Sequence, residues 1–464
     1  MRPALLRAAS ALLLPLCAAA WSAHARAAGE EETFNAYGQF THIWHEKRPF
    51  GAAYTNLNGT PNSLVPQRER SWTTTATAFL GWRVWSGGEL YFAPEAISEL
   101  PLSGLRGLGG SIQNGELEKN GLRSPTIYRS RLFLRQTWNL GGETSAVASG
   151  PLQLAGTQSA RRFTLTAGNL SVIDVFDRNA YAGDVRQQFL NMNFLTYSAY
   201  DFAADARGYS WGVAGEYATE DWTLRAGRFI GPVDPNQLKL NFSFLRRYGD
   251  QVELERRHVW AGQPGKLRVL AYRNVETMGR FDDALNAFLA DPARNATACT
   301  GFSYGSANAG APDLCWARRR NTKVGAGVSL EQALSPDAGV FVRAMRSDGR
   351  TEVFSYTASD RSLSLGAQFG GALWGRPRDR AGAGFAQNWI SASHVAYLAA
   401  GGIDGFIGDG AIRYRPERLV EAYYSLGLGR AFWLTLDAQR IANPAYNADR
   451  GPVSLWGLRF HAEF

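Results

Sequence analysis

The strongest constraint on the fold is a regular alternation of residue types at the end of the chain. From Trp456 to Phe464 every second residue is apolar, and the residues between them are polar or small. Successive side chains of a β-strand point to opposite faces, so this segment predicts a strand with one apolar face. Such strands build either a soluble sandwich or a membrane barrel. Further segments with this alternation are 209–217, 267–272, 420–428 and 432–439.

The first residues are typical of a secretory signal peptide. Arg2 and Arg7 precede an apolar stretch over residues 8–21, and small residues that suit cleavage follow at 23–27. We expect residues 1–27 to be removed during export. Their removal takes away three arginines and no acidic residue, which lowers the net charge from +8 to +5. This mild charge gives no reason to expect a nucleic-acid partner.

The C-terminus decides between the two kinds of sheet. An exported chain whose last strand ends in Phe464 resembles the signal that the outer-membrane barrel-assembly machinery recognises. After the signal peptide, no run reaches the roughly 18 consecutive apolar residues that a membrane helix needs. We therefore predict an all-β fold for residues 28–464, a single transmembrane antiparallel β-barrel in the outer membrane. Its length supports about 16 strands, within a range of roughly 14 to 18.

Short turns and long polar stretches separate the predicted strands. Glycine, proline and acidic residues mark four short turns, which we expect at the periplasmic end: 86–88, 219–221, 335–337 and 427–430. Four longer stretches are expected to be extracellular loops or segments folded into the pore: 96–126, 174–207, 279–321 and 373–386. No separate plug or helical domain is expected.

The sequence gives no support for catalysis or for metal binding. The chain has 6 histidines, and one of them lies in the predicted signal peptide. A barrel lipase would need a serine, a histidine and an orienting partner at one site, and single residues of each type are weak evidence. We find neither a metal-ligand spacing nor a phosphate-binding loop of the Gly-Lys-Ser/Thr kind. We expect no enzymatic activity, no cofactor and no bound metal.

Three arginines occupy one face of a predicted strand. Arg129, Arg131 and Arg135 alternate with other residues in the segment 128–138. An arginine that faces lipid near the midplane costs roughly 2–4 kcal/mol, so we expect this face to line the lumen. The row forms a basic pore wall, or it makes salt bridges that stiffen the wall, and both interpretations stay open. Acidic residues on other strands are possible counter-charges: Glu89, Glu95, Glu253 and Glu255.

A second set of pore candidates lies in the segment 174–191, which breaks the strand periodicity. Its candidate residues are Asp174, Asp177, Asn179, Tyr181, Asp184 and Arg186. A long stretch without strand character is usually functional or disordered, and its aromatic residues argue against disorder. We expect this segment to narrow the lumen, with carboxylates and arginines facing each other across the opening. An ordinary surface loop is the alternative.

Two cysteines remain after the predicted processing, Cys299 and Cys315. Both lie in one long polar segment, and the exported chain enters an oxidising compartment. We therefore expect a disulfide that closes and stabilises an extracellular loop.

Several motifs, in order along the chain, resemble the carbohydrate-selective porin (OprB) family. The longest is Arg-Phe-Thr-Leu-Thr-Ala-Gly-Asn-Leu-Ser-Val-Ile-Asp-Val-Phe-Asp-Arg-Asn-Ala-Tyr-Ala-Gly-Asp at 162–184, with Arg186, Phe189 and Asn191 after it. The other motifs are 205–212, 222–228, 248–255, 262–268 and 443–451. Together they extend over most of the chain that follows the signal peptide.

The resemblance implies a 16-stranded outer-membrane porin that passes small neutral sugars into the periplasm by facilitated diffusion. Guanidinium and carboxylate groups bind sugar hydroxyls in pairs, and a pore must bind weakly enough to release. The expected partners are such sugars, outer-membrane lipid with lipopolysaccharide, and the barrel-assembly machinery. The alternatives are a general diffusion porin or an exporter of acidic polysaccharide and, less in keeping with the sequence, a barrel enzyme or an adhesin.

Overall fold

The computed structural model describes residues 31–118, 121–304 and 310–464, and the predicted signal peptide lies outside them. Sixteen antiparallel strands form one closed barrel in which β1 pairs with β16, as the fold prediction required. The strands are β1 (Phe34–Lys47), β2 (Glu69–Trp85), β3 (Gly88–Leu100), β4 (Thr126–Val147), β5 (Gly156–Leu170), β6 (Ser210–Ala218), β7 (Trp222–Phe229), β8 (Tyr248–Trp260), β9 (Gln263–Met278), β10 (Arg319–Ser335), β11 (Ala338–Ser347), β12 (Arg361–Gly370), β13 (Arg380–Trp389), β14 (Glu417–Leu428), β15 (Phe432–Ala442) and β16 (Val453–Glu463).

The helices are short and lie in the connections between strands. The α-helices are α2 (Met192–Leu195), α3 (Phe281–Ala290), α4 (Pro292–Asn295) and α5 (Ala392–Ala399). The 3-10 helices are η1 (Leu57–Gly59), η2 (Leu102–Gly104), η3 (Val172–Asp174), η4 (Leu314–Ala317), η5 (Gly371–Trp374) and η6 (Pro444–Tyr446). Among the described residues, no helix is long and apolar enough to cross a membrane.

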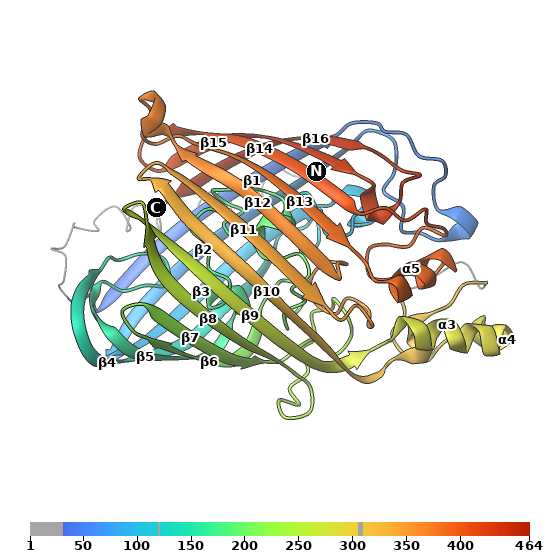
Figure 1. Cartoon of the computed structure of the whole chain (residues 1–464), viewed down its shortest axis with the longest axis horizontal. Coiled ribbons are helices and arrows are strands. Elements are labelled where there is room, and N and C mark those ends of the chain that lie inside the picture. The colour runs from blue at the N-terminus through green and yellow to red at the C-terminus, as the bar shows by residue number, and fades with distance from the viewer. Residues whose placement is uncertain (1–30, 119–120, 305–309) are drawn as a thin grey trace.

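The two ends of the barrel differ in the length of their connections. Short links such as 86–87, 219–221, 336–337 and 429–431 lie at the same end as the C-terminus. Figure 1 shows α3, α4 and α5 at the opposite end. Outer-membrane barrels have short periplasmic turns and long extracellular loops, so the helical end is the extracellular one.

Alternate residues of each strand face lipid and lumen, as the sequence periodicity predicted. On β9 and β10, Val269 and Val328 are exposed, whereas their neighbours Arg268 and Ser329 are fully buried. Outside the barrel these apolar side chains form a belt that suits the hydrocarbon core of a membrane. The buried faces carry polar and charged residues, which must find partners inside the barrel.

Two long connections fold back into the barrel. We call residues 171–209, which join β5 to β6, the pore loop. A second segment, 107–118 in the connection from β3 to β4, lies beside it: the backbone N–H of Gly115 donates to the carbonyl of Leu190, and that of Met192 donates to the carbonyl of Ile112. Both segments contain many buried residues, so they fill part of the lumen.

The prediction for residues 373–386 is wrong. This stretch is neither an extracellular loop nor a pore segment: it consists of the periplasmic turn around η5 and the first part of β13. The strand escaped notice because it alternates only Ala and Gly. A Cβ on Gly384 would lie 2.7 Å from the ring of Phe194, and one on Gly382 would lie 2.4 Å from the ring of Tyr423. Small residues here make room for aromatic rings inside the barrel.

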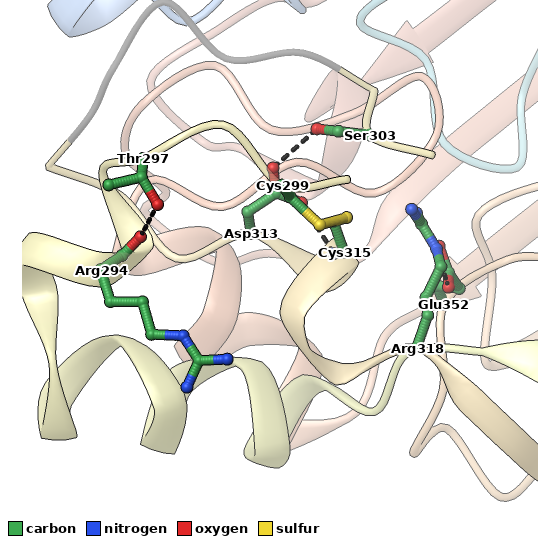
Figure 2. Close-up of a disulfide and its surroundings, with 8 residues drawn as sticks. All are labelled: Arg294, Thr297, Cys299, Ser303, Asp313, Cys315, Arg318 and Glu352. Carbon is green, nitrogen blue, oxygen red and sulfur yellow. Dashed lines mark hydrogen bonds and ion pairs between the residues drawn. A yellow bond between two sulfur atoms is a disulfide. The ribbon is translucent and has the colours of Figure 1, made fainter. Parts of the chain in front are cut away.

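A disulfide joins Cys299 to Cys315 in the extracellular connection between β9 and β10. Figure 2 shows it beside the carboxylate of Asp313, which accepts a hydrogen bond of 2.6 Å from the hydroxyl of Ser303. Close by, Arg318 forms a bidentate ion pair with Glu352 of the β11–β12 connection. The disulfide therefore closes a loop within the long β9–β10 connection, and the ion pair fixes this connection to its neighbour.

Candidate transport pathway

Three cavities follow one another along the inner face of β4. The cavity nearest the extracellular end has a volume of about 270 Å³ and is lined by Tyr128 and Arg131. The central cavity has a volume of about 440 Å³ and is lined by Phe133, Arg135 and Thr137. The third cavity, of about 500 Å³, lies beside residues 135–140 near the periplasmic end. The central cavity shares lining residues with each of the other two, so the three cavities lie in series beside the pore loop.

The extracellular and central cavities meet at a set of shared lining residues, which we call the narrow point. Residues that line both cavities mark it: Ile173, Asp174, Gly183, Asp184 and Leu195. All five belong to the pore loop, and two of them are carboxylates. Asp174, Gly183 and Asp184 of the segment 174–191 therefore lie where the extracellular and central cavities meet.

The side chain of Arg131 lies on the barrel wall beside the narrow point. Its Nε and Nη2 each donate a hydrogen bond of 2.7 Å to the carboxylate of Asp174, and its guanidinium lies over the ring of Tyr209. Asp174 also accepts the backbone N–H of Ser171, which holds the start of the pore loop in place. A bidentate pair of this kind fixes both side chains more firmly than a single hydrogen bond.

Arg186 makes a second fixed set of charges on the extracellular side of the narrow point. It donates 2.8 Å hydrogen bonds to Glu95 of β3 and to Glu116 of the β3–β4 connection. Glu95 also accepts hydrogen bonds from the hydroxyls of Thr77 and Tyr128. The arginines and carboxylates therefore touch each other instead of facing across an opening, which favours the salt-bridge interpretation of the sequence.

The prediction that Arg129 lines the lumen is wrong. Directly opposite residues in an antiparallel pair share a face, and Arg131 pairs with Ala93 while Arg129 pairs with Pro94. The register shifts there because Ser130 is an extra residue, a β-bulge. Arg129 consequently points outward, where its guanidinium lies 5.0 Å from the ring centroid of Trp211. A bulge leaves no trace in the alternation of residue types.

The other predicted pore residues lie inside the barrel but play different parts. Arg135 faces the central cavity and donates to the carbonyl of Leu152. Glu89 lines the periplasmic cavity and accepts a hydrogen bond from Tyr91. Asp184 uses a carboxylate oxygen to accept the backbone N–H groups of residues 186 and 187, and it forms no ion pair in the described part of the chain.

Asp177, Asn179 and Tyr181 fix the pore loop to the far wall. Asp177 is fully buried in an ion pair of 2.9 Å with Arg343 of β11. The side chain of Asn179 accepts the backbone N–H of Tyr181, whose ring lies against Gly339 of β11. These contacts hold this part of the pore loop against β11, while the central cavity extends to β4.

More of the barrel wall holds the pore loop by its backbone. Glu421 of β14 accepts the N–H groups of Leu190 and Asn191, and Arg459 of β16 donates to the carbonyls of Val185 and Gln188. Aromatic rings fill the space between these polar contacts: Phe189, Phe194, Phe341 and Tyr423.

The sequence interpretation missed one candidate in the segment that it had singled out. Arg178 is exposed to the central cavity, and its guanidinium makes no hydrogen bond or ion pair with any residue that the structure describes. Its neighbour Asp177 is buried. Charge alone does not distinguish these two adjacent residues, because only the packing of the pore loop decides which of them meets water.

The closed barrel, its apolar outer belt and the water-accessible route past an inward-folded loop define a channel of the outer-membrane porin class. No group of histidine, cysteine or acidic residues that could hold a metal occurs among residues 31–118, 121–304 and 310–464. A narrow point with fixed charges is suited to selecting solutes by size and hydrogen bonding.

Comparison with known proteins establishes the family. Residues 80–464 match the model of the carbohydrate-selective porin, OprB family, and the chain belongs to this family. The high-pH structure of Pseudomonas putida OprB superimposes with a TM-score of 0.65 at 15% sequence identity, over 95% of this chain and 100% of that chain. The low-pH structure of the same protein gives a TM-score of 0.47 at 11% identity, over 93% of each chain. A search of curated proteins found no match.

The first of these structural matches supports the barrel fold, and the family places the protein in the outer membrane. Family and fold are those of a channel and not of an enzyme.

Proposed function

We propose that this porin passes small neutral sugars into the periplasm by facilitated diffusion and catalyses no reaction. The observation that carries the proposal is the narrow point, where Arg131 is paired with Asp174 and lies over Tyr209. A paired guanidinium and carboxylate still offer hydrogen-bonding edges, while their net charge is close to zero. The Arg131–Asp174 pair itself favours a neutral polyol over an ion, while Asp184 at the same narrow point has no ion-pair partner in the described part of the chain.

The central cavity supports the same proposal. Its volume of about 440 Å³ lies within the range of roughly 300–1,000 Å³ that is usual for small-molecule sites. Beside charged residues such as Arg135, Arg178 and Glu216, uncharged hydrogen-bonding side chains line it: Thr137, Gln153, Gln158, Thr164, Thr166 and Gln188. Such groups exchange hydrogen bonds with hydroxyls at little net energy, which lets a sugar bind and leave.

The test is swelling of proteoliposomes in a panel of neutral sugars and size-matched sugar acids and amino sugars, with single-channel recording of block by the same solutes. We expect faster entry of the neutral sugars and a conductance block that saturates with sugar concentration. Equal entry rates without saturable block would show a general diffusion porin. Preferential passage of the acids would favour an exporter of acidic polysaccharide.

We also propose that Phe464 is the assembly signal for the barrel-assembly machinery. Its backbone N–H and carbonyl bond to Gly38 of β1, and its ring packs edge-on against Phe432. Deletion of Phe464 should leave periplasmic aggregates, whereas replacement by Tyr should assemble. Normal outer-membrane levels of the deletion variant, measured by fractionation, would contradict the assignment.

A further inference from the structure

On the outward faces of strands β11, β12, β14 and β15, arginines lie near the extracellular end. Arg346, Arg361, Arg418 and Arg440 lie near the extracellular ends of β11, β12, β14 and β15. Their strand positions place them on the lipid-facing side, in phase with exposed apolar residues such as Val342 and Val420. The periplasmic ends of the same faces carry apolar residues, among them Phe369 and Leu428. The asymmetry matches a membrane whose two leaflets differ in charge.

Two of these arginines face each other without an acidic partner. Arg346 of β11 and Arg361 of β12 are directly opposite in the strand register. Neither guanidinium forms an ion pair or a hydrogen bond with a residue in the described part of the chain. By contrast, Arg418 donates to Gln387, and Arg440 donates to Ser454. Like charges directly opposite on neighbouring strands are destabilising, and a bound anion would offset the repulsion between these two guanidinium groups.

An apolar groove begins at the two arginines and runs toward the middle of the barrel wall. Arg346, Arg361 and Trp389 line its extracellular end, and Val269, Val328 and Leu363 line the remainder. Ala326 and Ala344 form its floor, because their short side chains leave the surface lower than the valines beside them. The groove faces outward, where the membrane lies.

We infer that this groove is a binding site for a phosphorylated glycolipid of the outer leaflet. Arg346 and Arg361 bind a phosphate of its headgroup, and one acyl chain lies in the groove over Ala326 and Ala344. Guanidinium groups match phosphate geometry through bidentate hydrogen bonds. A soluble phosphate would satisfy the arginines but would leave the groove unoccupied, so the lipid accounts for both features. The inference rests on the outer-membrane location of the family and not on the proposed sugar transport.

The experiment uses the full-length mature porin in a mild detergent, and native mass spectrometry measures binding of diphosphorylated lipid A. We compare the wild type with the double variant R346A/R361A. The matched control is R256A, because Arg256 also faces outward, over the ring of Trp222, but lies near the periplasmic end of β8. We expect R346A/R361A to bind at least tenfold more weakly and R256A to bind like the wild type.

A second variant tests the groove without touching the charges. A344L fills the floor and should also weaken lipid A binding, while heat-modifiable migration on gels confirms that each variant is folded. Equal lipid A binding by wild type and R346A/R361A would overturn the inference. Displacement of lipid A by millimolar inorganic phosphate would also overturn it, because the site would then recognise a soluble anion. A wild-type dimer that R346A/R361A converts to a monomer would assign the face to a second copy of the chain.

Discussion

The two sides of the barrel interior use the same residue types for opposite purposes. On the side of β10 to β16, charged residues are buried against the pore loop, as Arg343 is with Asp177 and Arg459 is with backbone carbonyls. On the side of β3 to β6, Arg131, Arg135 and Arg178 line cavities. We call these the packed side and the open side.

The difference teaches that an inward-facing arginine does not by itself indicate a pore-lining residue. Burying an unpaired charge is costly, so each arginine on the packed side is matched to a carboxylate or to carbonyl oxygens. On the open side, water supplies hydrogen bonds wherever protein groups do not. Partners, and not charge, therefore separate Arg343 and Arg459, which hold the pore loop, from Arg178, which is exposed to the central cavity.

The largest effect is expected on the packed side. Replacing Arg343 by Ala leaves Asp177 buried without its partner, which costs about 3–5 kcal/mol for a fully buried pair. The pore loop should detach from β11, and single-channel recordings should show larger and noisier conductance. R346A is the matched control, since Arg346 lies three positions further on β11 and faces outward. A quiet channel of wild-type conductance in R343A would show that the packed side does not hold the loop.

The next effect concerns the narrow point. Replacing Arg131 by Ala should free the carboxylate of Asp174, and a charge in water attracts a cation at 4 Å by about 1 kcal/mol, or roughly fivefold in occupancy. Reversal potentials in a salt gradient should shift toward cation selectivity, and conductance should rise. R129A should leave both unchanged, because Arg129 faces lipid. If R129A and R131A behave alike, the bulge at Ser130 has been misplaced.

A smaller effect is expected in the central cavity. Arg178 has no protein partner among the described residues, so its removal costs little stability. If it hydrogen-bonds sugar hydroxyls, R178A should weaken sugar block by about 1 kcal/mol, or roughly fivefold, without changing the open-channel conductance greatly. Titration of single-channel block with sugar measures this. Unaltered block in R178A would remove Arg178 from the sugar route.

The smallest effect on conductance is expected outside the membrane. Burial disfavours a charged His394, but hydrogen bonds to Asp360 and Asp404 outweigh it and raise the pKa of His394 to about 9. A raised pKa means that the charged histidine stabilises α5 fully below pH 6.5, and that this stabilisation is lost as pH rises through 9. Hydrogen exchange of residues 392–399 should accelerate above pH 9 in the wild type. In H394Q the exchange rate of these residues, corrected for the intrinsic rate at each pH, should stay constant as the pH rises through 9.

The sequence predicted the barrel well because alternation is a local property. The segments around Val269, Val420 and Trp456 became strands with the expected faces. The strand β13 was missed because its inner face carries glycines, which make room for the rings of Phe194 and Tyr423. Alternating Ala and Gly do not differ enough in polarity to show which residues face inward. Arg129 was misassigned because a bulge shifts the phase without altering composition.

The pairing of charges could not be predicted, because the partners are far apart in the sequence. Asp177 meets Arg343, and Glu95 meets Arg186, only after the barrel has closed around the pore loop. The segment 174–191 was recognisable as unusual, but its contacts with strands from β3 to β16 depend on the closed cylinder. The exposure of Arg178 could not be predicted for the same reason, because it depends on how the pore loop packs inside the closed barrel.

The arrangement of the three cavities in series has an electrical consequence. Ions that cross them meet resistances that add, and the largest resistance controls the current. The five residues shared by the extracellular and central cavities should therefore contribute more to the resistance of the pore than the loops at either end of the barrel. A longer side chain at Gly183, one of these five residues, is therefore expected to reduce the current more than a change of the same size in a loop at either end of the barrel.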